Sequence, residues 1–248
     1  MIQNFESLVL IWLGIGFITF ITLLKIPAPY GKFSKTNWGP MIPSKLGWIV
    51  MEIISPLALL YFFLNGNIEK SPTNITFISL WTLHYFNRSV IYPLRQNNPA
   101  KMPLLIAVLA FLFNVMNGYI NGTYFGSIQE YSAEYMSNWN FIVGVCLFIT
   151  GAYINIKSDN ILLSLRSKSG EYKIPEGFMF RYVSFPNYLG EILEWMAFAI
   201  MTWSLAGLSF MIWTMANLVP RAIKGHQWYH SKFESYPKNR KAIFPFII

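Results

Sequence analysis

Charged side chains are scarce in this chain of 248 residues. Asp, Glu, Lys and Arg together make up 12% of it, whereas hydrophobic residues make up 54% and the mean hydropathy is +0.39. A soluble globule of this size could not cover its surface with so few polar side chains. The composition therefore excludes an ordinary water-soluble domain and predicts a protein that lies in lipid.

Cysteine is nearly absent, because Cys146 is the single one and it lies inside an apolar run. This excludes an internal disulfide and a cysteine-rich metal site. No His, Cys or carboxylate set has the spacing of metal ligands, and no Ser/His/Asp arrangement can be argued, so we expect no metal and disfavour a hydrolase. The glycine-rich Rossmann and P-loop motifs are lacking as well.

Acidic residues are also few, with 11 Asp and Glu against 19 Lys and Arg, which gives a formal charge of +8. A basic chain can bind nucleic acid, but in a chain this apolar the positive-inside bias of membrane proteins is the simpler explanation. We therefore expect membrane lipids, and no nucleic acid, as partners.

Long apolar runs are what the sequence does have. About 20 apolar residues cross a bilayer core of about 30 Å, so the runs predict an all-α integral membrane protein with seven transmembrane helices. We expect these helices near residues 6–26, 45–65, 74–94, 102–122, 139–158, 187–204 and 207–231.

Charge distribution orients these helices. With the N-terminus outside and the C-terminus cytosolic, the inner segments hold all but Lys70 of the 19 Lys and Arg residues. These segments are 25–45, 88–101, 157–185 and the tail from Arg221, which leaves the membrane. The orientation therefore agrees with the positive-inside rule. We find no repeat or linker and expect one domain, residues 1–248.

Ionisable residues at membrane depth are functional candidates, because each costs roughly 2.5–3.5 kcal/mol to insert. They are Glu52, Arg88, Glu191 and Glu194. An isolated neutral carboxyl at Glu52 could donate a hydrogen bond to a carbonyl group. A structural carboxyl, paired with Arg88 or with a backbone group, explains Glu52 equally well.

Tyr85 lies on the third predicted helix, about 100° around the axis from His84. A phenol buried beside a carboxylic acid could polarise a ketone, because both groups donate to its oxygen as negative charge develops there. An interfacial Tyr and Arg that anchor the helix end would give the same pattern. The spacing does not decide between the two.

The polar stretch Asn155–Pro186 follows a helix directly, and we expect it to form an extramembrane ligand-binding surface. Its Arg and Lys can hold phosphates, its Asn and Asp can bind ribose hydroxyls or a carboxamide, and its Tyr can stack on a cofactor. The tail Arg221–Tyr229 could close over such a cofactor. A solvated basic loop and an anionic-lipid anchor are the alternatives for the stretch and the tail.

Two motifs resemble those of the steroid 5α-reductase family. Residues 233–246 are similar to its terminal F-x-x-Y-P-x-x-R-K-A-x-x-P-F signature. Residues 182–195 are similar to its Y-V-S-x-x-N-x-x-G-E-x-x-E-W motif. The resemblance covers most of the chain and is densest from Asn155 onward.

The resemblance implies a seven-helix reductase that binds NADPH from the cytosolic side and admits an enone steroid from the bilayer. The substrate-side helices would lie mainly in residues 1–125, and the cofactor-binding part mainly in residues 139–248. The positions that hold the ketone match Glu52 and Tyr85, with Trp48 and Met51 in the substrate pocket. Hydride would pass to the β-carbon of the enone, and the α-carbon would then be protonated.

The resemblance also implies a cofactor site. The matching positions are Asn155, Asp159, Arg166, Tyr172, Asn187, Glu191, Arg221 and Tyr229, and by looser similarity Arg88 and Lys173. This cationic set fits the extra phosphate of NADPH rather than NADH. The membrane would be a bacterial inner membrane or that of the endoplasmic reticulum.

Two positions depart from the family pattern: Met51, where relatives often have Gln, and Gly225, where many have His. We therefore expect some substrate contacts to differ. The alternatives are a reductase of another enone, enoyl-thioester or polyprenyl lipid, and an isoprenylcysteine-type membrane methyltransferase. A non-catalytic lipid-binding or scaffolding protein would need every buried charge to be a structural ion pair.

Overall fold

The computed structural model describes residues 2–96, 100–165 and 172–248. It is almost entirely helical and divides into two compact units. Unit 1 comprises Met1–Val9 and Ala28–Ile142, and unit 2 comprises Leu10–Pro27 and Val143–Ile248. The first helix, α1 (Ile2–Lys25), therefore contributes to both units.

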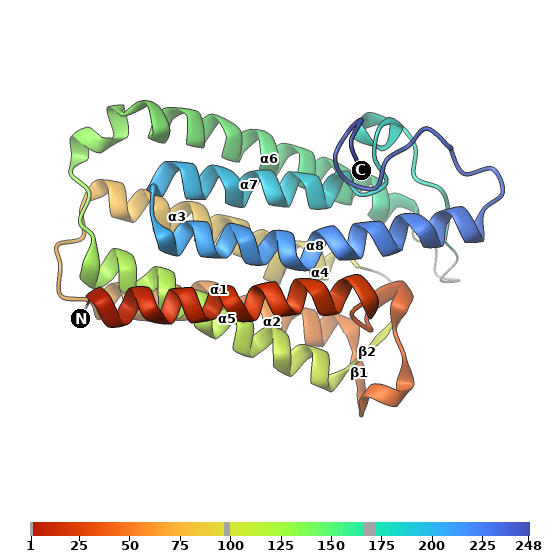
Figure 1. Ribbon diagram of the computed structural model, residues 1–248, viewed down its shortest axis with the longest axis horizontal. Helices are drawn as coiled ribbons and strands as arrows, with labels where there is room; N and C mark the ends of the chain where they lie inside the picture. Colours follow the sequence, from red (N-terminus) through yellow and green to blue (C-terminus); the bar gives the residue numbers. More distant parts are fainter. Residues whose placement is uncertain (1, 97–99, 166–171) are drawn as a thin grey trace. The chain divides into compact units, whose positions relative to one another are not determined.

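Unit 1 is built on three long helical stretches (Figure 1). They are α2 (Ser44–Leu64); α3 (Pro72–Phe86), which runs through a π-helical turn (Asn87–Ile91) into α4 (Tyr92–Leu94); and α5 (Leu104–Thr123), extended by a second π-helical turn (Tyr124–Ile128). Short 3-10 turns lie at Gly31–Phe33, Thr36–Trp38 and Ala133–Ser137.

Small residues bring α2 and α5 close together. A Cβ atom added at Gly118 would lie 2.6 Å from the Cβ of Ala58, and one added at Gly122 would lie 2.6 Å from the carbonyl oxygen of Leu59. Glycine at such positions lets two helix backbones approach closely in a membrane protein. A short antiparallel pair, β1 (Met41–Pro43) with β2 (Lys101–Pro103), ties together the segments that precede these two helices.

Asn74 fastens the start of α3 to the end of α5. Its amide nitrogen donates to the carbonyl oxygens of Phe125 (2.8 Å) and Gln129 (2.9 Å), and its amide oxygen accepts from the backbone N–H of Tyr131 (3.2 Å). Asn74 and Asn121, which both begin Asn-x-Thr glycosylation patterns, are fully buried inside helices. In the folded protein neither amide is open to a sugar-transferring enzyme.

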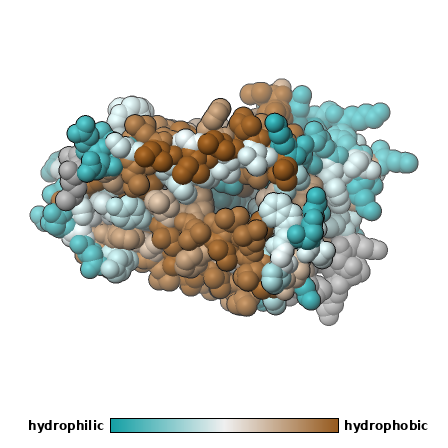
Figure 2. Space-filling view, turned by 60° about the horizontal axis from the view of Figure 1, so that its bottom comes forward, coloured by the Kyte–Doolittle hydropathy of each residue, from teal (hydrophilic) through white to brown (hydrophobic). Residues whose placement is uncertain are grey.

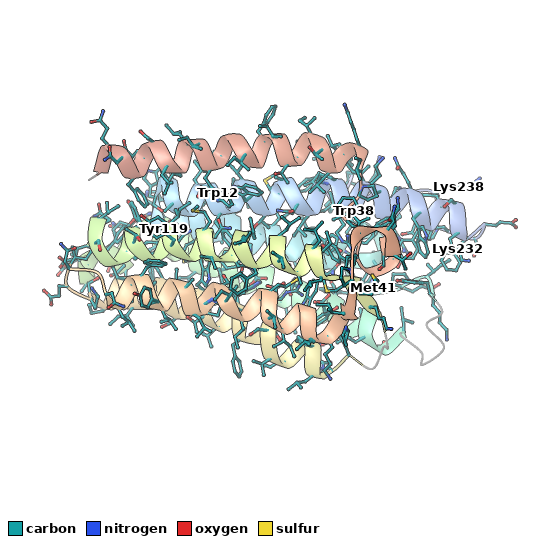
Figure 3. The ribbon with its side chains drawn as sticks, turned by 90° about the horizontal axis from the view of Figure 1, so that it is seen from below. Trp12, Trp38, Met41, Tyr119, Lys232 and Lys238 are labelled. Carbon is teal, nitrogen blue, oxygen red and sulfur yellow. The ribbon has the colours of Figure 1, made fainter. Side chains whose placement is uncertain are left out.

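Unit 2 contains α6 (Trp139–Leu165, of which the first turn belongs to unit 1), α7 (Pro186–Thr202), α8 (Leu205–Lys232) and a 3-10 turn (Phe178–Arg181). Helices α7 and α8 form an antiparallel hairpin (Figure 1). Trp12, on the part of α1 that belongs to unit 2, points towards α8 (Figure 3). Its ring lies 4.5 Å from that of Trp213, whose indole N–H donates to the Trp12 carbonyl oxygen.

The positions predicted for the helices are confirmed, with one difference. Helix α6 ends at Leu165, whereas the sequence predicted its end near residue 158. The prediction placed a loop from Asn155 because polar residues begin there. The segment from Ile161 to Leu165 is apolar again except for Ser164, however, and it lacks Gly and Pro, so the helix continues.

Four helices in the described part of the chain are long and apolar enough to cross a membrane: Gln3–Lys25, Ser44–Leu64, Leu104–Ile128 and Trp139–Leu165. Hydrophobic side chains cover much of the face drawn in Figure 2. The chain is a multi-pass membrane protein. Three other predicted crossings fall on α3 (15 residues), α7 (17 residues) and the more polar α8, so the seven-crossing topology stays a prediction.

Candidate active site

Tyr85 is held rigidly in unit 1. Its ring stacks on that of Trp81 at 5.7 Å, one helical turn earlier, and the Trp81 indole N–H donates to the hydroxyl of Ser55 on α2 at 3.1 Å. The π-helical turn begins two residues after Tyr85, and the Ser89 hydroxyl donates to the Tyr85 carbonyl oxygen at 2.7 Å. Tyr85 is buried, with its hydroxyl directed towards α5.

The hydroxyl of Tyr85 meets an amide that the sequence analysis did not single out. It donates to the side-chain oxygen of Asn114 on α5 at 3.4 Å. The amide nitrogen of Asn114 donates to the main-chain carbonyl oxygen of Met51 at 2.6 Å. One buried amide therefore joins Tyr85 to the residue that precedes Glu52.

Trp48, Met51 and Glu52 occupy neighbouring turns of α2. Met51 is buried in a small apolar cluster with Met102 and Ala107, and Glu52 is partly buried. The guanidinium of Arg88 lies over the Trp48 ring at 5.2 Å and over the Tyr92 ring at 5.1 Å. Such stacking holds a buried cation between aromatic faces. The structure therefore brings Arg88 to the predicted substrate residues of unit 1.

Three predicted cofactor residues meet where α6 lies against α7 in unit 2. The side-chain amide nitrogen of Asn155 donates to the main-chain carbonyl oxygen of Asn187 at 2.9 Å. The side-chain amide nitrogen of Asn187 donates to a carboxylate oxygen of Asp159 at 3.0 Å. All three side chains are buried. The helices can approach this closely because Gly151 faces Gly190, where an added Cβ atom would lie 2.6 Å from the Gly151 carbonyl oxygen.

Two buried oxygen atoms beside this trio lack a hydrogen-bond partner among the described residues. They are the amide oxygen of Asn187 and the hydroxyl of Ser158. A buried polar atom without a partner costs about 1–3 kcal/mol. Asn187 therefore offers an unused acceptor, and Ser158, next to Asp159 in the sequence, offers an unused hydroxyl. Both could bind the hydroxyl or carboxamide groups of a ligand.

Arg221 and Tyr229 lie on α8 at either end of an aromatic group. The Arg221 guanidinium donates to the hydroxyl of Tyr188 on α7 at 3.0 Å. The Tyr188 ring stacks on Phe185 at 5.2 Å, and Phe185 lies 6.1 Å from the Tyr229 ring. Tyr188 is thus a positioning partner for Arg221 that the sequence analysis missed, since its residue type gave no reason to prefer it over other tyrosines.

The structure describes three further predicted cofactor residues of unit 2, Tyr172, Lys173 and Glu191. Tyr172 is exposed, with its ring 5.0 Å from that of Trp228 on α8, and Lys173 is exposed beside it. Glu191 is partly buried on α7, one turn after Asn187. Arg166 lies outside the described residues.

The two family-like motifs fold onto each other in unit 2. Residues Tyr182–Phe185 and Lys241–Ala242 exchange main-chain hydrogen bonds, with Val183 and Lys241 forming a parallel bridge. We call these paired segments, with the side chains that join them, the C-terminal clasp. In the C-terminal clasp, residues of one motif are hydrogen-bonded to residues of the other.

A directional chain of hydrogen bonds runs through the C-terminal clasp. The buried Arg240 donates to the Tyr236 hydroxyl at 3.3 Å, and Tyr236 donates to the Ser184 hydroxyl at 2.7 Å. The Ser184 hydroxyl lies 2.6 Å from Nδ1 of His226 and can donate to it when that nitrogen carries no proton. Partial burial, reinforced by His230, Arg240 and Lys241, lowers the pKa of His226 to about 4. Geometry and charge agree on a neutral imidazole.

Comparison with known proteins gives close matches. The family model described as 3-oxo-5-alpha-steroid 4-dehydrogenase matches residues 100–248. Steroid 5-alpha-reductase DET2 of Solanum lycopersicum is 43% identical over 98% of this chain and 96% of its own length. The DET2 protein of Arabidopsis thaliana is 43% identical over 92% of this chain and 91% of its own.

The similarity extends to mammals. The 3-oxo-5-alpha-steroid 4-dehydrogenase 1 of Rattus norvegicus is 37% identical over 94% of this chain and 91% of its own length. The relatives are named as reductases and a dehydrogenase, so they give the methyltransferase alternative no support. With identities of this level over nearly the whole length, the chain belongs to the steroid 5α-reductase family and is an oxidoreductase.

Proposed function

We propose that this protein uses NADPH to reduce the Δ4 double bond of 3-oxo-Δ4-steroids, giving 5α-3-oxosteroids. One observation carries the proposal beyond family membership: the buried hydroxyl of Tyr85 and the main chain next to Glu52 are held by the same amide, that of Asn114. Two potential hydrogen-bond donors to a ketone are thereby tied together inside an apolar and aromatic unit.

Glu52 and Tyr85 would act on the substrate's ketone oxygen. When NADPH is bound, it supplies the hydride that adds to the β-carbon of the enone. Negative charge then develops on the ketone oxygen, where the two side chains donate hydrogen bonds, and a proton completes the reaction at the α-carbon. Donors fixed in advance in a water-poor site stabilise such a charge strongly. Trp48 and Met51 would supply apolar contacts to the steroid.

The residues of unit 2 suit NADPH. The unused amide oxygen of Asn187 and the hydroxyl of Ser158 match a ligand rich in carboxamide and hydroxyl groups. Arg221 adds a fixed cation for a phosphate. The proposed cofactor residues are Asn155, Asp159, Arg166, Tyr172, Asn187, Glu191, Arg221 and Tyr229, and by looser similarity to the family Arg88 and Lys173.

We further propose that the chain acts as one domain, residues 1–248, with seven crossings, the N-terminus outside and the C-terminus cytosolic. The charge distribution supports this orientation. The substrate-side helices would lie mainly in residues 1–125 and the cofactor-binding part mainly in residues 139–248. Either a bacterial inner membrane or that of the endoplasmic reticulum would provide the lipid-soluble substrate.

The direct test follows NADPH absorbance while detergent-purified protein is incubated with testosterone or progesterone, and identifies the product by mass spectrometry. We expect loss of NADPH and a product heavier by two hydrogens. If NADPH binds but no Δ4-3-ketosteroid is reduced, the substrate is another enone lipid. If NADPH does not bind, the proposed function is wrong.

Two substitutions test the assignment of the catalytic residues. Tyr85→Phe removes the phenol donor, and Glu52→Gln replaces the acidic O–H donor by a less acidic amide N–H, each while nearly keeping the shape of the side chain. We expect Tyr85→Phe to lower turnover by about 10²–10³-fold, the usual effect of losing one such donor, and Glu52→Gln to lower turnover by a smaller factor. NADPH affinity, measured by calorimetry, should stay within about twofold of the unmodified protein. Unchanged turnover in either variant would remove that residue from the mechanism.

A further inference from the structure

We propose that Asn114 is a positioning residue: its amide sets the Tyr85 hydroxyl relative to the turn of α2 that carries Glu52. This inference rests on the proposed function, because it concerns the same two catalytic groups. Asn114 lies on α5, in an apolar run without Asp, Glu, Lys, Arg or His. Only 4% of it is exposed.

Both ends of the Asn114 amide are in use. The nitrogen donates to the Met51 carbonyl oxygen at 2.6 Å, and the oxygen accepts from the Tyr85 hydroxyl at 3.4 Å. A carbonyl oxygen can only accept, so the nitrogen must face Met51 and the oxygen must face Tyr85. The amide therefore cannot rotate by half a turn without losing the bond to Met51. The Tyr85 hydroxyl proton accordingly points at the Asn114 amide oxygen.

The turn of α2 beside Glu52 is an irregular part of the helix. Pro56 lies inside α2 and has no N–H, so it cannot give the carbonyl oxygen of Glu52 the usual helical hydrogen bond. The bond from Asn114 reaches the preceding carbonyl, that of Met51, from a different helix. It is short because Gly118, one turn further along α5, lets the two helices approach closely.

The two hydrogen bonds of Asn114 differ in strength, which suits a positioning role. The bond to Met51 is short, whereas the bond from Tyr85 is long for a hydroxyl donor, whose usual range is about 2.5–3.0 Å. A ketone oxygen that approaches Tyr85 can therefore take over its proton at little cost. Asn114 keeps the hydroxyl oriented beforehand and releases it to the substrate.

A purely structural role, as a polar contact between α2 and α5, is the competing explanation, and Asn121 offers a matched control. It lies on the same helix two turns later, is also fully buried, and its amide nitrogen donates to the Asn117 carbonyl oxygen of its own helix. Its side-chain bond reaches neither Tyr85 nor α2. Replacing it by leucine imposes the same change of shape and polarity without touching the proposed catalytic groups.

The experiment compares Asn114→Leu with Asn121→Leu, using the steroid-dependent oxidation of NADPH. We expect Asn114→Leu to lower kcat by about 10–100-fold, the scale of misplacing a catalytic group by about 1 Å. Its NADPH affinity should remain within about twofold, and Asn121→Leu should keep kcat within about twofold. Equal kcat values for the two variants, or a loss of NADPH affinity that accounts for the effect of Asn114→Leu, would overturn the inference.

Asn114→Asp provides a second readout, the pH dependence of turnover. A neutral carboxyl can still donate to Met51 and accept from Tyr85, whereas a carboxylate repels the Met51 carbonyl and holds the Tyr85 proton too tightly. We expect the turnover of this variant, divided by that of the unmodified protein, to rise as the pH falls. A pH-independent ratio would count against the inference even if Asn114→Leu fails to fold.

Failure of the inference and failure of the proposed function give different results. If the unmodified protein reduces the steroid and Asn114→Leu behaves like Asn121→Leu, only the role of Asn114 is wrong. If the unmodified protein does not reduce it, the proposed function fails and the inference fails with it.

Discussion

His226 illustrates how a single proton can be fixed by its neighbours. Arg240 donates to Tyr236 and Tyr236 donates to Ser184, whose hydroxyl meets Nδ1 of His226. A protonated His226 would present a second donor to Ser184, which already accepts from Tyr236. The neighbouring His230, Arg240 and Lys241 oppose the added charge further.

The stability of the protein should therefore depend on pH through His226. The unfolded chain takes up the proton below the ordinary histidine pKa of about 6.5, whereas the folded protein resists until its pKa of about 4. The unfolded state binds more protons in this window, so stability is lost as the pH falls from about 6.5 towards 4. We expect the unfolding temperature of His226→Asn, which keeps an acceptor but does not titrate, to fall less steeply over this range. Parallel curves would contradict the assignment.

The predictability of individual residues depended on their chemistry. Asn155, Asp159 and Asn187 were predicted as one cofactor group, and the structure brings them into hydrogen-bond contact. Asn114 was missed because the search for unusual residues in apolar runs relied on ionisable groups, and a neutral amide does not stand out. Only its contacts with Met51 and Tyr85 reveal it, and these depend on how α2, α3 and α5 pack.

At the scale of helices, glycine decides how closely α6 and α7 approach. An alanine at position 190 would place its Cβ atom 2.5 Å from the backbone nitrogen of Asn155, and neither backbone can yield locally. The three proposed cofactor residues Asn155, Asp159 and Asn187 lie at this contact. The distance between the two helices and the geometry of the trio are therefore coupled.

Gly190→Ala should consequently impair both stability and cofactor binding. Overpacking of this kind costs about 1–3 kcal/mol. We expect a lower unfolding temperature and weaker NADPH binding, both measurable on the purified protein. Gly14→Ala on α1 is the control: no atom lies within 4 Å of its added Cβ, so it should be neutral or stabilise the helix by about 0.5–1 kcal/mol. Equal effects of the two substitutions would argue against a tight α6–α7 contact.

The helices themselves were predictable because apolar runs and chain breakers mark them strongly. The end of α6 was not predictable, since the polar residues in its last turns have the composition of a loop. Nor could the sequence predict that α1 contributes to both units, because its composition does not change along its length. Such a division depends on tertiary contacts alone.

At the scale of the whole molecule, the proposed topology makes a labelling prediction. Cys146 is the chain's single cysteine, so Cys146→Ala gives a background without thiols. Glu69→Cys should react with a membrane-impermeant maleimide added outside intact cells or correctly oriented vesicles. Lys238→Cys, in the segment that follows α8 (Figure 3), should react only after the membrane is permeabilised. Both positions are exposed, so reaction of both from the same side would contradict an odd number of crossings between them.

The C-terminal clasp has a consequence for biosynthesis. Ser184 receives its partners from Tyr236 and Lys241, which are translated after all the long helices have been made. While the ribosome still encloses that segment, the nascent chain can already have its helices in the bilayer, but Ser184 and its neighbours lack these partners. Emergence of this segment from the ribosome is then needed to complete unit 2. A chain truncated before Tyr236 would lack the partners of Ser184 and would reach cellular quality control as an incompletely folded membrane protein.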